Sequence, residues 1–70
     1  MFREKVKSQT LRSIGYDPAG RVLELEFTGG GVYRYMDVPE SVYFALVVAD
    51  SKGRYFDYFI RDRFVFRKIT

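Results

Sequence analysis

The sequence predicts an α+β fold in which a small antiparallel sheet carries two short helices packed on one of its faces. Apolar and polar residues alternate over Arg21–Phe27 and over Val32–Met36, as in half-buried strands, with three glycines between the two runs. After Pro39 the apolar residues take a helical spacing, with a break at Asp50-Ser51. The expected order is therefore β-β-β-α-α-β, within one domain of residues 10–70.

The N-terminal part of the chain is expected to contain an arm and one strand. Residues 1–9 are mostly polar and show no periodicity, so we expect a flexible arm without a strand. A strand over Thr10–Tyr16 then runs to the sequence Asp17-Pro18-Ala19-Gly20. Aspartate first, proline second and glycine last is the pattern of a type I β-turn, which returns the chain into the next strand.

The next two strands are expected to form a hairpin. In the first of them, the apolar side chains share one face and the two glutamates, Glu24 and Glu26, share the solvent face. Gly29–Gly31 supplies the turn, because glycine tolerates positive φ. In the return strand, Tyr33 and Tyr35 lie on one face. Arg34 then lies on the other face, beside one of the glutamates.

The sequence contains residues that are typical of the beginnings and ends of two helices. Pro39 is suited to a helix start, because its missing N–H group is not needed in the first turn. Ser51 is a good N-cap for a second helix that ends near Ile60, whose apolar residues lie on one face. A closing strand is expected over Phe64–Ile69.

The composition excludes several classes of function. The chain has 70 residues with no cysteine and no histidine, so disulfides, thiolate metal sites and imidazole bases are absent. We therefore expect no enzyme, no catalytic residues, no bound metal and no small-molecule cofactor. No apolar run approaches the roughly 20 residues of a membrane-spanning helix, and nothing resembles a signal peptide. We expect a soluble cytoplasmic protein without membrane contact.

Basic residues are concentrated near the C-terminus. The net charge is +3, but Lys52 to Lys68 holds six basic residues against two acidic ones, a local charge of +4. Such a segment attracts phosphate backbones, which predicts binding of RNA or another nucleic acid. Tyr33 and Tyr35 either pack in the core or form a platform for unstacked bases. The basic residues of this prediction are Lys52, Arg54, Arg61, Arg63, Arg67 and Lys68.

Ser51-Lys52-Gly53 allows two interpretations that are compatible. A serine N-cap with a lysine at a helix start offers free N–H groups and positive charge, so an anion could dock there. The structural interpretation is a plain cap, with Gly53 allowing the preceding helix to approach closely.

Apolar residues surround the first helix almost completely. They cannot all face one core, and an exposed apolar patch is typical of a partner surface or a homodimer. The alternative function is therefore a protein-interaction module that uses Tyr43, Phe44, Val47 and Val48.

Several short motifs follow one another in a fixed order, among them Ile14-Gly15-Tyr16-Asp17, Val38-Pro39-Glu40 and Ser51-Lys52-Gly53. In this order they resemble the KTSC domain family, which occurs at the C-terminus of some lysyl-tRNA synthetases and alone in small bacterial and phage proteins. The family's central Y-x-Y is matched by Tyr33 and Tyr35. The resemblance covers about Leu11 to Ile69 and implies RNA as a partner, because the domain is attached to a synthetase. Many members carry a basic residue where this chain has Asp57, which interrupts the basic segment.

Overall fold

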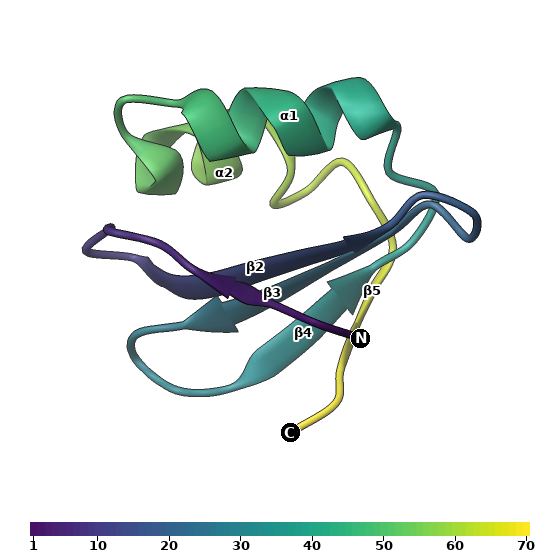
Figure 1. Cartoon of the computed structure of the whole chain (residues 1–70), viewed down its shortest axis with the longest axis horizontal. Helices are drawn as coiled ribbons and strands as arrows, with labels where there is room; N and C mark the ends of the chain where they lie inside the picture. The colour runs from purple at the N-terminus through teal and green to yellow at the C-terminus, as the bar shows by residue number, and fades with distance from the viewer.

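The chain forms a five-stranded antiparallel sheet whose strands lie side by side in chain order. The computed structural model describes residues 1–70. Helices α1 and α2 lie over one face of the sheet, so the expected α+β fold is confirmed, with one additional strand (Figure 1). Neither helix is long and apolar enough to cross a membrane. The elements are β1 (Glu4–Lys5), β2 (Leu11–Asp17), β3 (Val22–Phe27), β4 (Val32–Tyr35), α1 (Glu40–Val48), α2 (Lys52–Phe59) and β5 (Phe66–Lys68).

The central strand, β3, fixes the two faces of the sheet. Leu23 pairs with Tyr35, and Leu25 pairs with Tyr33. Paired residues of antiparallel strands point to the same face, so the tyrosines lie with the leucines on the helix-covered face. Tyr35 is buried in the core, whereas Tyr33 is half-buried beside it. The hairpin glycines Gly30 and Gly31 have φ values of 111° and 93°, as the turn prediction requires.

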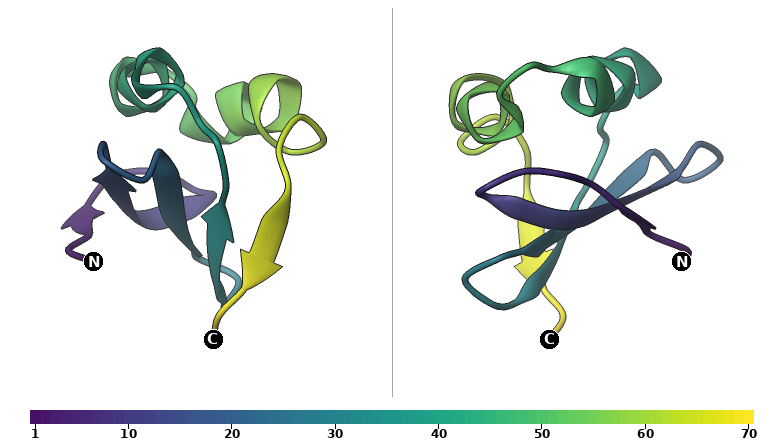
Figure 2. Two further views of the ribbon diagram at one scale, coloured as in Figure 1. Left: turned by 90° about the vertical axis from the view of Figure 1, so that its right-hand side faces the viewer. Right: turned by 60° about the vertical axis from the view of Figure 1, so that its left-hand side comes forward.

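The two helices form a layer over one face of the sheet, as Figure 2 shows. The core is formed by side chains of both layers. Helix α1 contributes the buried side chain of Leu46, and helix α2 contributes that of Phe56. Ile60, directly after α2, is a third buried side chain. A core this small depends on aromatic rings, which bury roughly 150–250 Å² each. Its members are Leu11, Ile14, Leu23, Leu25, Tyr35, Val38, Leu46, Phe56 and Ile60.

Helix α2 begins as predicted, but its glycine has another neighbour than expected. The Ser51 hydroxyl accepts a hydrogen bond from the Arg54 N–H at 3.3 Å, which confirms the N-cap. The expectation that Gly53 accommodates the preceding helix is wrong. A Cβ at Gly53 would lie 2.2 Å from Thr10 Oγ1, so the missing side chain admits the segment that leads into β2.

The N-terminal arm contains a strand that the sequence did not reveal. Glu4 and Lys5 pair with Ile14 and Ser13 of β2, which corrects the expected absence of a strand before residue 10. A Cβ at Gly15 would lie 2.5 Å from the Phe2 carbonyl oxygen, so this glycine lets the arm cross β2. Two residues are too few for an alternation pattern, which is why the strand was missed. The flexibility of the arm stays a prediction.

Two C-terminal expectations also change. The closing strand is shorter than the expected Phe64–Ile69. Backbone hydrogen bonds still join the neighbouring residues: the Met36 N–H donates to the Val65 carbonyl, and the Ile69 N–H donates to the Val32 carbonyl. Phe59, expected on the inner face of α2, is 51% exposed because the helix ends there and Ile60 takes the buried position.

The outer face of the sheet holds a buried carboxylate. Glu24, expected to face solvent, is only 2% exposed because Arg3 and Arg34 cover it and both donate to its carboxylate. Burial alone would raise the pKa of Glu24, but the hydrogen bonds from Arg34 and Arg3 lower it below its usual value. The predicted position of Arg34 opposite a glutamate is confirmed.

Replacing this carboxylate tests its role. We expect Glu24→Gln to lower the free energy of unfolding at pH 7 by about 2 kcal/mol, because it removes a buried charge from between two arginines. Because the pKa of Glu24 is lower in the folded protein than the value of about 4.3 in the unfolded chain, the ionised carboxylate stabilises the fold. This contribution is fully present above the unfolded pKa and is lost as the pH falls through the folded pKa. The variant should therefore lose less stability than the wild type between about pH 5 and pH 3. Urea unfolding at both pH values measures this.

Glu26→Gln is the matched control on the same strand and face, because an amide oxygen can still accept the Ser13 hydroxyl. We expect it to cost less than about 1 kcal/mol at pH 7. Equal losses in the two variants would contradict the assigned role of Glu24.

The contact between α2 and Thr10 gives a second prediction. We expect Gly53→Ala to destabilise the protein by about 1–3 kcal/mol, because the added methyl group meets Thr10, and this outweighs the better helix propensity of alanine. Adding Thr10→Ala should restore part of the loss by removing the hydroxyl. Gly29→Ala, which meets nothing within 4 Å, is the control and should change the melting temperature little. A Gly53→Ala protein as stable as the Gly29→Ala protein would refute the contact.

Candidate nucleic-acid interface

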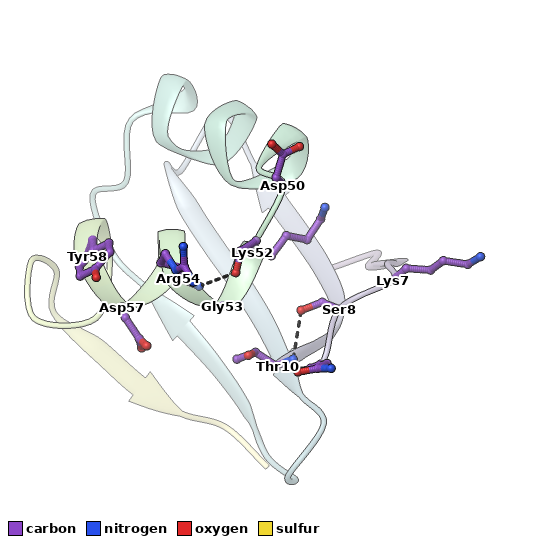
Figure 3. Close-up of a pocket in the computed structure, with 11 residues that line it drawn as sticks. Lys7, Ser8, Thr10, Asp50, Lys52, Gly53, Arg54, Asp57 and Tyr58 are labelled. Atoms are coloured by element: carbon purple, nitrogen blue, oxygen red, sulfur yellow. Dashed lines mark hydrogen bonds between the residues drawn. The ribbon is translucent and has the colours of Figure 1, made fainter.

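A polar cleft of about 520 Å³ lies where the start of α2 faces the segment between β1 and β2 (Figure 3). The Ser8 hydroxyl accepts the Thr10 N–H at 3.0 Å and thereby orders one wall. The predicted anion site lines the other wall. The cleft is formed by Lys7, Ser8, Gln9, Thr10, Asp50, Ser51, Lys52, Gly53, Arg54, Asp57 and Tyr58.

Charge in this cleft is nearly balanced. Three basic and two acidic residues line it. The Lys52 ammonium donates to the carbonyl of Ala49 at 3.3 Å, so it closes the end of α1. The Ser51 hydroxyl is occupied by its cap hydrogen bond. The cap at Ser51 is thus confirmed, and anion binding at Ser51-Lys52-Gly53 stays a prediction.

A second, aromatic pocket of about 380 Å³ lies between β4, β5 and the C-terminal end of α2. We call it the aromatic pocket. Its buried side is formed by rings of the core, and two charged residues at the end of α2, Arg61 and Asp62, are exposed. The other lining residues are Phe27, Gly30, Tyr33, Tyr35, Phe56 and Phe66.

The two predicted tyrosines play different parts in this pocket. Tyr35 is 4% exposed and packs edge-on against Phe56, with ring centroids 5.7 Å apart. Tyr33 is only half-buried, and its ring centroid lies 5.9 Å from that of Phe66. Phe66 also lies 5.5 Å from Tyr35 and is 53% exposed. The accessible aromatic surface therefore comes from Tyr33 and Phe66.

Phe66 is the residue that sequence reasoning missed. It pairs with Tyr35 across β4 and β5, and so shares the face of the tyrosines. The alternation Phe64-Val65-Phe66 in the expected closing strand was a signal for this. The pairing partner of that strand could not be read from the sequence.

The Tyr35 hydroxyl keeps its proton over the whole physiological range. Burial raises the pKa of Tyr35 to about 12, and the neighbouring Tyr33 and Asp62 also favour the protonated form. Arg61 acts in the opposite direction. The charges of Arg61 and Asp62 therefore both influence the pKa of Tyr35, which lines the pocket.

The structure divides the predicted basic residues among several places. Lys52 and Arg54 line the polar cleft, and Arg61 lines the aromatic pocket. Lys68 pairs with Tyr33 on the helix-covered face, whereas Arg67 pairs with Arg34 on the outer face. Arg63 is exposed in the connection before β5.

Few of these basic residues are neutralised. Among the six, only Arg61 forms an ion pair, with Asp57 at 3.5 Å, and both partners are more than half exposed. Such an exposed pair is worth about 0–1 kcal/mol, so it leaves the arginine free to exchange partners.

Three of the four residues of the alternative interface are exposed to solvent. Phe44, Val47 and Val48 are 56%, 36% and 76% exposed on α1. Tyr43 is instead stacked on Tyr16, with ring centroids 4.7 Å apart. No group of three or more Asp or Glu side chains is placed to hold a metal ion.

Comparison with known proteins places the chain in a family. The sequence pattern of the KTSC domain matches residues 7–64. A crystal structure of a KTSC domain protein from Yersinia pestis superposes with a TM-score of 0.96 at 45% identity, covering 99% of this chain and 97% of that one. An uncharacterized protein from Stutzerimonas stutzeri is 51% identical over 57 residues, which are 81% of this chain and 80% of that protein.

Part of a larger enzyme is also similar. A lysine–tRNA ligase from Nostoc sp. is 35% identical over 66 residues, which are 94% of this chain but only 12% of the ligase. A lysine–tRNA ligase from Nostoc punctiforme matches over the same shares. The match of the family pattern over most of the chain, the shared fold and these relatives agree with the Y-x-Y motif of Tyr33 and Tyr35. The chain therefore belongs to the KTSC domain family.

Proposed function

We propose that this domain binds RNA, without catalysing a reaction, through the basic residues of α2, the following connection and β5. The observation that carries the proposal is the set of four exposed arginines and Lys68 in this segment, of which only Arg61 has an acidic partner. Arg61 lines the aromatic pocket and Lys68 lies beside the hairpin turn at its edge, where Tyr33 and Phe66 offer ring surface. Basic groups beside accessible aromatic rings are typical of proteins that bind single-stranded nucleic acid.

The relatives support RNA as the nucleic acid. The lysine–tRNA ligases that contain a similar segment act, by their name, on a tRNA. A domain with this surface could add affinity for an RNA chain without reading a long sequence, because phosphate contacts depend on charge alone.

The proposal can be tested by titrating labelled single-stranded and hairpin RNA at two salt concentrations. We expect affinity to fall with salt, with a slope in log–log form of about −0.7 for each phosphate contacted on a single strand. The double variant Arg54→Gln, Arg63→Gln should bind more weakly and reduce the size of that slope by about 1.4. Both side chains are exposed and form no ion pair, so folding should be unaffected.

Arg12→Gln is the matched control, because Arg12 is an exposed arginine on β2, three strands from β5. It should bind RNA like the wild type. Absence of RNA binding at low salt, or an equal loss in the control, would overturn the proposal.

A second candidate function is interaction with a protein partner or a second copy through α1. The exposed side chains of Phe44 and Val48 favour it, because more than half of each lies open to solvent on α1. We expect Phe44→Glu to abolish any concentration-dependent association seen in sedimentation. A monomer at all concentrations would exclude the homodimer.

A further inference from the structure

The aromatic pocket has the form of a receptor for one flat ring. Its volume of about 380 Å³ lies near the lower end of the roughly 300–1,000 Å³ of small-ligand pockets. Phe27, Phe56 and Tyr35 form its buried side, and their rings are fixed by edge contacts with centroids 5.2–5.7 Å apart. Phe66 leaves half of its surface uncovered. A planar group that enters the pocket can therefore stack on a ring that is already held in place.

One side of the pocket is kept open by the hairpin turn. Gly30 lines the pocket at a φ of 111°, and a Cβ there would meet nothing within 4 Å. The turn therefore places no side chain across the opening. Lys68 lies beside the same turn, since its Cε is 3.4 Å from the Cβ position of Gly31. An ammonium group thus stands next to the opening, where a phosphate of a bound chain could pass.

The charged residues of the pocket offer a particular hydrogen-bonding pattern. Asp62 forms no ion pair, so its carboxylate is free to accept two hydrogen bonds. Arg61 is bound only by its exposed contact with Asp57 and can turn its guanidinium toward a ligand. A carboxylate beside a guanidinium complements a ring edge that presents two N–H donors next to a carbonyl oxygen. Among the RNA bases, the Watson–Crick edge of guanine has this arrangement.

We propose that the aromatic pocket receives a single unstacked guanine base, stacked on the uncovered face of Phe66 beside Tyr33 and held at its edge by Asp62 and Arg61. The inference rests on the proposed RNA binding and adds a base preference to it. The polar residues then select the base, while Lys68 and the other exposed basic residues hold the phosphates on either side.

The test uses single-stranded oligouridine of about eight nucleotides, a length in the range of small single-strand sites. Its central residue is changed to guanosine, adenosine or an abasic unit. We expect the guanosine oligomer to bind the wild type about tenfold or more tighter than the abasic one, and tighter than the adenosine one. Phe66→Ala should remove most of the gain for every base. Asp62→Asn should remove the preference for guanine over adenine and keep the stacking gain.

Two matched controls accompany these variants. Val65→Ala truncates the exposed side chain next to Phe66, and Asp37→Asn removes a carboxylate outside the pocket at a residue whose φ of 57° suits asparagine. Both should keep the wild-type preference. Unfolding curves for all four variants establish that they are folded.

The outcomes separate the inference from the proposed function. Salt-dependent binding with equal affinity for all four oligomers would overturn the guanine pocket and leave RNA binding standing. Absence of binding for every oligomer at low salt would overturn both. A further readout needs no RNA chain: in NMR spectra, guanosine monophosphate should shift the ring signals of Tyr33 and Phe66, and ribose 5-phosphate should not. Shifts confined to the polar cleft would also contradict the proposal.

Discussion

The alternation of apolar and charged side chains along β3 sets which face of the sheet the helices cover. Leu23 and Leu25 have no exposed surface on the inner face, and Glu24 is buried on the outer one. A shift of one residue in the pairing would place the carboxylate in the core and the leucines in solvent. Because Tyr33 and Tyr35 are paired with these leucines, the position of the aromatic pocket depends on the same register.

The small size of the chain explains why its two faces are protected by different means. Two short helices can cover only one face of five strands (Figure 2). The outer face is closed by Arg3 and Arg34 over Glu24, an arrangement that compensates the burial of one carboxylate with two arginines. Arg3 thereby also ties the N-terminal arm to the sheet. At the β5 edge Val65 and Phe66 are more than half exposed, and aromatic surface stays accessible there.

The candidate binding features are distributed over the two ends of α2. Its N-terminal end, with Ser51 and Lys52, uses its polar groups to close helices, so little of the charge predicted there is free. Its C-terminal end brings Arg61 and Asp62 next to the rings of β4 and β5. A segment similar to this chain makes up 12% of a lysine–tRNA ligase from Nostoc sp..

The sequence alone determined the hairpin around Gly30 and Gly31, the cap at Ser51 and the α+β class, because alternation, glycine at positive φ and capping are properties of neighbouring residues. It also carried the Y-x-Y motif that marks the family. Tertiary structure decided what depends on residues far apart in the chain. The pairing of Phe66 with Tyr35, the burial of Glu24 and the contact of Gly53 with Thr10 all follow from packing between distant segments, which no local pattern records.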